Sequence, residues 1–268
     1  MTPPDGEIAL FNDAAIGIAP PPAELQGYAH RLGFAALPPL ADGVTTLQPS
    51  GYIRVQRGAM VAILDVGPVG PDYLPGHAHA DTLSFELSLF GRRVLVDSGT
   101  SRYGTGPERL RQRGTAAHNT VTIDGADSSE VWGGFRVARR ARPTGLQVES
   151  SAGALRVSCA HDGFRRLRGA PMHRRMWTFS DGCVEVRDEV RGAGRAEGHW
   201  HWAPGLEISA INPCTVRLDD RHALTVATEG AAWSVDRTTW HPEFGCSLRN
   251  QCLVVEPERG ESVVAFAF

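Results

Sequence analysis

The residues best suited to chemistry in this sequence are three histidines and an aspartate. His77 and His79 alternate with small residues in Gly-His-Ala-His-Ala-Asp. On an extended chain, residues two apart point to the same face, so the two imidazoles are expected side by side. Asp97 follows the apolar run Arg93–Val96, and His118 precedes another β-rich run. All four side chains therefore lie beside the ends of predicted strands.

Two imidazole nitrogens and one carboxylate oxygen form a ligand set that suits Zn²⁺. A hairpin that ends at Asp97 and a strand that begins after His118 could bring these ligands together without a long linker. Each histidine taken singly is better explained as a hydrogen-bonded core or surface residue. On spacing alone, a metal site and a set of ordinary histidines remain equal alternatives.

The elements that must position these residues are short strands separated by Gly, Asp, Asn or Pro turns, at a spacing of roughly 8–12 residues. This pattern is typical of antiparallel sandwiches. We therefore predict an all-β fold, a large antiparallel multi-stranded β-sandwich, with a short N-terminal helical connector. The helix is expected over Pro22–Leu32 and is closed by Gly33. The predicted strands are Tyr52–Val55, Met60–Val66, Thr82–Leu89, Arg93–Val96, Thr120–Ile123, Gly145–Glu149, Leu155–Cys159, Arg174–Phe179, Cys183–Val190, Thr215–Leu218, Ala223–Thr228 and Cys252–Glu256.

Composition excludes several classes of protein. The 268 residues are 42% hydrophobic and carry a formal charge of −3, so nothing draws the chain toward nucleic acid. No apolar run approaches the ~20 residues that span a bilayer. The five cysteines are odd in number and scattered, which argues against a disulfide framework and a zinc ribbon. All 27 basic residues are arginines, a side chain that grips carboxylates and sulfates in a bidentate way.

Two groups outside the His77–His118 region also have functional alternatives. Arg174-Arg175 could dock an anionic glycan, but a solvated strand edge is the simpler interpretation. Trp200 and Trp202 alternate with His199 and His201. We predict a buried aromatic pair with two exposed imidazoles, rather than a second metal site.

The central block resembles a known family. The sequence reads HAHADTLSFELSLFGRRVLVDSGTSRYGTG from His77 and continues as AAHNTVTIDG from Ala116. This block, with the residues up to Pro143, is similar almost without gaps to the signature of the heparinase II/III-like polysaccharide lyases. Fragments near His161 and Pro242 and the lead-in before Gly33 are similar to that family as well.

The resemblance implies a role for each matching residue. His79, Asp97 and His118 fall where the family holds zinc. His77 falls on a histidine that faces the substrate cleft, and Tyr103 falls on a tyrosine near that cleft, so both are candidate catalytic residues. For contact with the anionic sugar, the candidates are Asn119 and Arg113.

The resemblance also implies what surrounds this chain. Residues 1–35 would be a connector with a remnant helix, and residues 36–268 the β-sandwich domain. The partners would be an anionic uronate polysaccharide and a helical toroid domain of the same or a neighbouring polypeptide, and a homodimer is also compatible. Without the toroid, the chain is expected to be inactive as a lyase. Family members usually act in the periplasm or cell envelope. The alternatives are a non-catalytic carbohydrate-binding or envelope-polysaccharide module, and a metal-stabilised structural sandwich.

Overall fold

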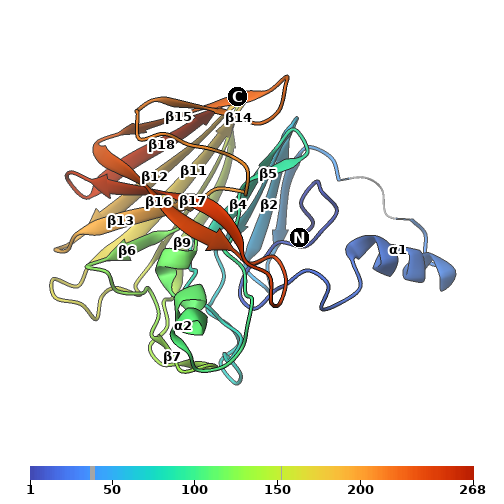
Figure 1. Ribbon diagram of the computed structural model, residues 1–268, viewed down its shortest axis with the longest axis horizontal. Helices are drawn as coiled ribbons and strands as arrows, with labels where there is room; N and C mark the ends of the chain where they lie inside the picture. The colour runs from blue at the N-terminus through green and yellow to red at the C-terminus, as the bar shows by residue number, and fades with distance from the viewer. Residues whose placement is uncertain (37–39, 152) are drawn as a thin grey trace.

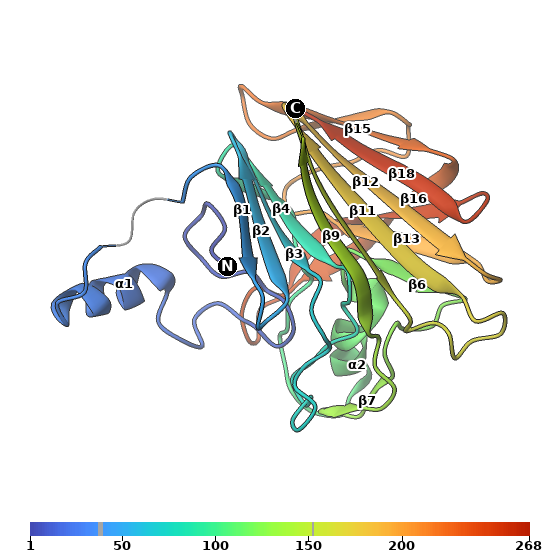
Figure 2. The same ribbon diagram turned by 180° about the vertical axis from the view of Figure 1, so that it is seen from behind.

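The computed structural model describes residues 1–36, 40–151 and 153–268. Its strands pair antiparallel within sheets, and the sheets pack into a sandwich (Figures 1 and 2). The five-stranded sheet has the order β1-β2-β3-β4-β5, with bounds Gly43–Leu47, Tyr52–Arg57, Met60–Asp65, Phe85–Leu89 and Arg92–Leu95. The four-stranded sheet has the order β16-β17-β13-β6, with bounds Ala231–Trp240, Leu248–Pro257, Ala196–His201 and Val121–Ile123.

These two sheets are joined into one layer. The N–H of Val96 donates to the carbonyl of His201 at 2.9 Å, and the N–H of Ala203 donates to the carbonyl of Val94 at 2.9 Å. The chain after β5 therefore continues along β13. This seam brings Asp97 close to the start of β6, where His118 lies.

The opposite layer is one seven-stranded sheet. Its order is β14-β15-β18-β12-β11-β10-β9, with bounds Cys214–Arg217, Ala223–Glu229, Glu261–Ala267, Cys183–Arg191, Met172–Ser180, Ala154–His161 and Pro143–Ser151. The two layers enclose one apolar core, and its largest side chains are Trp177, Trp200, Trp202, Phe85, Phe179 and Phe266. Strand β12 alternates buried and half-buried residues along most of its length, as a strand with one face on a core does.

The predicted fold class is confirmed: the chain is an antiparallel β-sandwich with few helical turns. The predicted helix is present as α1, Pro22–Arg31. A second helix, α2 at Pro107–Arg113, leads into the 3₁₀ turn Thr115–Ala117 and was not predicted. The two-residue strands β7, Val131–Trp132, and β8, Arg136–Val137, form a small separate hairpin.

The N-terminal lead-in divides into two parts. Residues 1–16 pack against the sandwich, with Leu10 and Phe11 buried, and Leu10 N–H donates to Glu86 Oε1 at 3.0 Å. Helix α1 has no buried residue, and both views draw it away from the sheets. The predicted boundary after residue 35 falls between α1 and β1, and residues 1–16 pack on the sandwich.

One prediction about β13 was half right. Trp200 and Trp202 are buried, as expected, but His199 and His201 are buried too. Strand β13 lies between β17 and β6 inside its sheet, and the loops that precede β6 cover its second face. Its imidazoles are therefore enclosed rather than exposed.

Candidate functional site

The candidate residues meet where several chain segments leave the sandwich. His77 and His79 lie in the long loop between β3 and β4, Asp97 directly follows β5, and His118 lies between α2 and β6. Helix α2 and the β7–β8 hairpin lie at the lower end of Figure 1, below the sheets. Loops carry the side chains, and the sheet ends fix where those loops start.

Two buried histidines, His79 and His118, form the centre of the site. Their ring centroids lie 5.3 Å apart, with 48° between the ring planes. Each imidazole is oriented by one buried carboxylate. His79 Nε2 donates to Asp13 Oδ1 at 2.8 Å, and His118 Nδ1 donates to Asp97 Oδ2 at 2.8 Å.

The second nitrogen of each ring has no hydrogen-bond partner among the described residues. These atoms, His79 Nδ1 and His118 Nε2, are both buried. Because the other nitrogen of each ring donates to a carboxylate, the free nitrogen of the neutral ring carries a lone pair. A metal ion is the partner that such an imidazole, with a carboxylate behind it, typically takes. The two nitrogens are therefore candidate ligands for a metal ion.

The electrostatics of the two rings differ. Burial and the neighbouring His118 lower the pKa of His79, although the hydrogen bond to Asp13 opposes the shift. His79 is therefore neutral at neutral pH, as a metal ligand must be. Burial also acts to lower the pKa of His118, but the charge and hydrogen bond of Asp97 outweigh it and raise that pKa. Metal binding at His118 would thus have to displace a more firmly held proton.

Asp97 supports His118 in this geometry. Its Oδ2 accepts from the His118 ring, and its Oδ1 accepts the N–H of Gly99 at 3.0 Å. Across the part of the chain that the structure describes, no three His, Cys, Asp or Glu side chains are grouped so that they could hold a metal ion. The structure places the His79 ring beside the His118 ring and bonds His118 to Asp97, and zinc binding stays a prediction.

Asp13 links this centre to the surface, and the sequence analysis missed it. Besides His79, its carboxylate accepts from His77 Nδ1 at 2.9 Å and from Arg109 Nη2 at 2.7 Å. Burial acts to raise the pKa of Asp13, but His79, Arg109 and His77 together hold it well below its ordinary value. A single ionised carboxylate therefore orients two imidazoles and a guanidinium. Its one signal in the sequence is a polar Asn12-Asp13 pair directly after the apolar Leu10-Phe11.

An exposed cluster of rings covers Asp13 and Arg109. The side chain of His77 is 61% exposed, and Tyr103 is 43% exposed. Their ring centroids lie 5.9 Å apart, and Phe135 lies 5.6 Å from His77 and 5.1 Å from Tyr103. Arg109 lies under this cluster, 5.2 Å from the Tyr103 ring. A cation beneath the ring faces stabilises their arrangement.

His77 and Tyr103 present different proton chemistry to solvent. Because Asp13 holds Nδ1 of His77, the Nε2 atom is left to act as an acceptor in the neutral ring. Burial and the nearby Asp13 raise the pKa of Tyr103, so its phenol stays protonated at neutral pH. One side chain can thus accept a proton where its neighbour can donate one.

Asn119 and Arg113, predicted to contact substrate, are buried. The Asn119 amide hydrogen-bonds three backbone groups of the neighbouring strands at 2.6 to 3.0 Å. Arg113 Nη2 donates to the carbonyl of Ala78 at 2.9 Å, and burial lowers its pKa to about 10. The structure does not bring these two side chains to the surface that carries His77 and Tyr103. In this geometry they hold the loops that carry the histidines.

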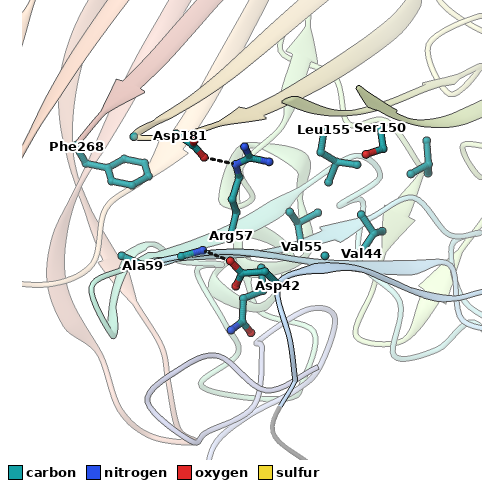
Figure 3. Close-up of a pocket in the computed structure, with 14 residues that line it drawn as sticks. Asp42, Val44, Val55, Arg57, Ala59, Ser150, Leu155, Asp181 and Phe268 are labelled. Carbon is teal, nitrogen blue, oxygen red and sulfur yellow. Dashed lines mark hydrogen bonds and ion pairs between the residues drawn. The ribbon is translucent and has the colours of Figure 1, made fainter. Parts of the chain in front are cut away.

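A cavity of about 900 Å³ lies elsewhere, between the edges of the five-stranded and seven-stranded sheets. Figure 3 shows Val44, Val55 and Leu155 along it, with Arg57 pointing at Asp181. Arg57 Nε lies 2.7 Å from Asp181 Oδ1, so the one basic side chain of the lining is already paired. None of the predicted site residues lines this cavity.

Comparison with known proteins agrees with the fold. The family model described as heparinase II/III-like, C-terminal, matches residues 42–265. A crystal structure of heparinase III has a TM-score of 0.79 at 18% identity, and covers 99% of this chain and 46% of that chain. The heparan sulfate lyase HepC from Pedobacter heparinus has a TM-score of 0.76 at 18% identity, and covers 99% of this chain and 44% of that chain. No curated protein matches the sequence.

The coverage is unequal in both comparisons. This chain is matched almost completely, yet it spans less than half the length of either similar structure. At this low identity the likeness establishes the shared fold. The family assignment comes from the match over residues 42–265.

Proposed function

The chain belongs to the heparinase II/III-like family as a C-terminal domain, and on that premise we propose that it forms one wall of a lyase active site. The substrate would be a uronate-containing polysaccharide, cleaved by β-elimination. The observation that carries the proposal is the exposed pair His77 and Tyr103, held side by side above the ionised Asp13.

Elimination needs a base, an acid and charge neutralisation. The base takes the C5 proton, a C4–C5 double bond forms, the bond from C4 to the leaving oxygen breaks, and the acid protonates that oxygen. His77 Nε2 would be the base, because Asp13 orients the ring through Nδ1. Tyr103, protonated at neutral pH, would be the acid. The C5 proton becomes acidic only when the uronate carboxylate is neutralised by a donor or cation.

We propose that His79, His118 and Asp97 hold Zn²⁺ beneath this surface. The two buried ring nitrogens, His79 Nδ1 and His118 Nε2, support the two histidines as ligands. Asp97 bonds the opposite nitrogen of the His118 ring, so it would have to give up that hydrogen bond to ligate the ion. The ion would supply a fixed positive charge that braces the loops and would not react with substrate. His79 shares the Asp13 carboxylate with His77, so a brace at His79 would also fix the candidate base.

A helical domain would supply the other wall. Segment 18–34 exposes five large apolar side chains, and exposed apolar clusters of this kind typically mark contact surfaces. They are Ile18, Leu25, Tyr28, Leu32 and Phe34. The similar heparinases are more than twice as long as this chain, which leaves room for such a domain in them. We propose the periplasm or cell envelope as the location, because anionic polysaccharides are reached there. No helix of the described residues is long and apolar enough to cross a membrane.

The elimination is tested with the longest polypeptide that the gene encodes and with the 268-residue chain alone. We expect unsaturated uronate absorbance from the longer polypeptide and negligible turnover from the chain alone. His77→Gln and Tyr103→Phe should each lower kcat at least ~100-fold. Tyr73→Phe, at an exposed position outside the proposed site and outside segment 18–34, is the matched control. Wild-type turnover in both site variants would refute the assignment, and glycan binding with no elimination would favour a non-catalytic carbohydrate-binding module.

Zinc is tested separately by metal analysis of the purified chain after dialysis. Wild type and His30→Gln should retain about one zinc per chain, and His79→Ala should retain little. Equal zinc content in wild type and His79→Ala would end the metal proposal, whatever the outcome of the activity assay.

A further inference from the structure

A second concave surface lies beside α2, outside the residues proposed to react. It encloses about 800 Å³, within the size range of sites that bind small ligands. Its lining comes from α2, from the adjacent strands β16 and β17, and from the loop after β13. Three of its side chains are arginines: Arg111, Arg237 and Arg249.

The pairing of β16 with β17 puts two of these arginines on one face. Arg237 pairs across the strands with Gln251, and Thr239 pairs with Arg249. Residues two apart on a strand share a face, as do directly opposed residues, so these four side chains point to the same side. Arg111 reaches that side from α2, where its Nη2 donates to Thr239 Oγ1 at 2.9 Å.

The three guanidinium groups are not equally free. Arg111 lies 2.7 Å from Glu108 and is largely neutralised. Arg237 and Arg249 are exposed, and no carboxylate in the described part of the chain lies within ion-pair distance of either. Glu207 is the one acidic side chain in the lining. The depression therefore has an excess of positive charge and two guanidinium forks that could each grip an oxyanion.

The hairpin that lines this depression also reaches the surface around Tyr103. Phe244, in the loop that joins β16 to β17, lies 4.8 Å from the Tyr103 ring, and Gly245 N–H donates to the carbonyl of Ser101 at 2.8 Å. On the other side of this loop, Arg111 Nη2 lies 2.9 Å from His241 Nε2. One hairpin thus carries the free arginines on its strands and touches Tyr103 with its loop.

We propose that this depression is a distal subsite for the anionic groups of a polysaccharide whose cleaved bond lies at His77 and Tyr103. It rests on the proposed function for the identity of the ligand. Arg237 and Arg249 bind the carboxylate or sulfate groups of sugar units beyond the loop at Phe244. Arg111 is a positioning residue here, since its guanidinium is already engaged by Glu108 and Thr239.

The test is a binding measurement on the 268-residue chain, with a heparin octasaccharide and an unsulfated alginate octamer as probes. The variant is Arg237→Gln/Arg249→Gln. The control is Arg217→Gln/Arg221→Gln, which removes the same charge from exposed positions on and beside β14, in the seven-stranded sheet. We expect the first variant to weaken binding about tenfold or more at low salt, and the control to change it less than about twofold.

The outcomes separate the subsite from the proposed reaction. If Arg237→Gln/Arg249→Gln loses affinity only for the sulfated probe, the two arginines bind sulfate groups. If it loses affinity equally for both probes, they bind carboxylate groups. An unchanged Kd in the Arg237→Gln/Arg249→Gln variant, an equal loss in the control, or no measurable binding by wild type would each overturn the subsite. The reaction itself stands or falls on the turnover of His77→Gln, which leaves both arginines in place.

Discussion

Two buried clusters in this domain contain the same kinds of side chain, histidine and aspartate, but differ in how completely their hydrogen bonds are satisfied. The first joins His79 and His118 to Asp13 and Asp97 beneath the proposed active site. The second joins His161 and His173 to Asp188 and Arg175, between the sandwich layers. Both are enclosed, and both contain ionised carboxylates beside imidazoles.

In the second cluster every ring nitrogen is used. Gly163 N–H donates to His161 Nδ1 at 3.1 Å, His161 Nε2 donates to His173 Nδ1 at 3.2 Å, and His173 Nε2 donates to Asp188 Oδ1 at 2.7 Å. Arg175 closes the chain with two bonds to Asp188, at 2.7 and 2.8 Å, and donates to the backbone of Leu83 and Asn119. A fully satisfied polar network fixes one packing arrangement and leaves nothing to bind.

In the first cluster two ring nitrogens are left over. His79 Nδ1 and His118 Nε2 are as deeply buried as the nitrogens of the second cluster, but no donor meets them. Burial and carboxylate partners are therefore common to both clusters and do not set one apart as a binding site. The two differ in their unused ring nitrogens, which in the first cluster are the atoms where a ligand could bind.

The largest effect is expected from breaking the satisfied cluster. Arg175→Met leaves Asp188 buried with His173 as its remaining side-chain partner, and should lower the free energy of unfolding by about 3–5 kcal/mol. The control is Arg187→Met on β12, whose ion pairs are exposed and should be worth less than about 1 kcal/mol. Urea unfolding of both variants measures the difference. Equal losses of unfolding free energy in the two variants would show that the second cluster stabilises the fold no more than an exposed ion pair does.

The next largest effect is the change in thermal stability on adding zinc, which only the first cluster should produce. Saturating zinc should raise the Tm of wild type, since a ligand at 100 times its Kd stabilises by about 2.7 kcal/mol. The rise should persist in His161→Gln, which alters only the satisfied cluster, and vanish in His118→Gln. Thermal melts with zinc and with a chelator provide the measurement. A zinc-dependent rise in His118→Gln would mean that the first cluster does not bind the ion through His118.

A smaller effect should appear in the pH dependence of stability. Burial, then the nearby His173, Arg175 and Arg166, hold the pKa of His161 well below its ordinary value, and the more distant Asp188 opposes them. The unfolded chain therefore takes up a proton at His161 below pH ~6.5 when the folded chain does not, and stability falls as pH falls through that window.

His161→Gln should accordingly make the stability profile less steep between about pH 7.5 and 5.5, while the other buried histidines with a lowered pKa keep part of the slope. Urea midpoints across that range measure the slope, with His30→Gln on the exposed helix α1 as the control. A slope that is equally steep in His161→Gln and wild type would mean that this imidazole does not titrate as its burial requires.

The sequence predicted the fold well where local patterns decide. Alternating apolar runs marked most strands, and the hairpin from Phe85 to Leu95 did deliver Asp97 beside His118. Strand β16 was missed although Ala231, Trp233 and Val235 alternate along it and pack half-buried against the core. Helix α2 was missed although Pro107 and Glu108 in its first turn are ordinary start signals.

The residue roles that the sequence did not predict depend on contacts between distant segments. Asp13 lies 64 residues before His77 in a segment that reads as a connector, and its role exists only once residues 1–16 pack on the sandwich. Arg175 was expected in a solvated pair with Arg174, yet it is buried. The strand period could have shown this, since His173, Arg175, Trp177 and Phe179 share the inward face of β11.

The smallest effect on stability is expected at the residue most important to the proposed reaction. The side chain of His77 is mostly exposed, and Asp13 keeps Arg109 and His79 as partners when that imidazole is removed. His77→Gln should therefore change the free energy of unfolding by no more than about 0.5 kcal/mol, as surface substitutions usually do. Urea unfolding of His77→Gln beside Tyr73→Phe measures it. A loss of unfolding free energy as large as that of Arg175→Met would show that His77 stabilises the fold as a member of the first cluster. Its exposed imidazole would then no longer be distinct from the buried structural histidines of the second cluster.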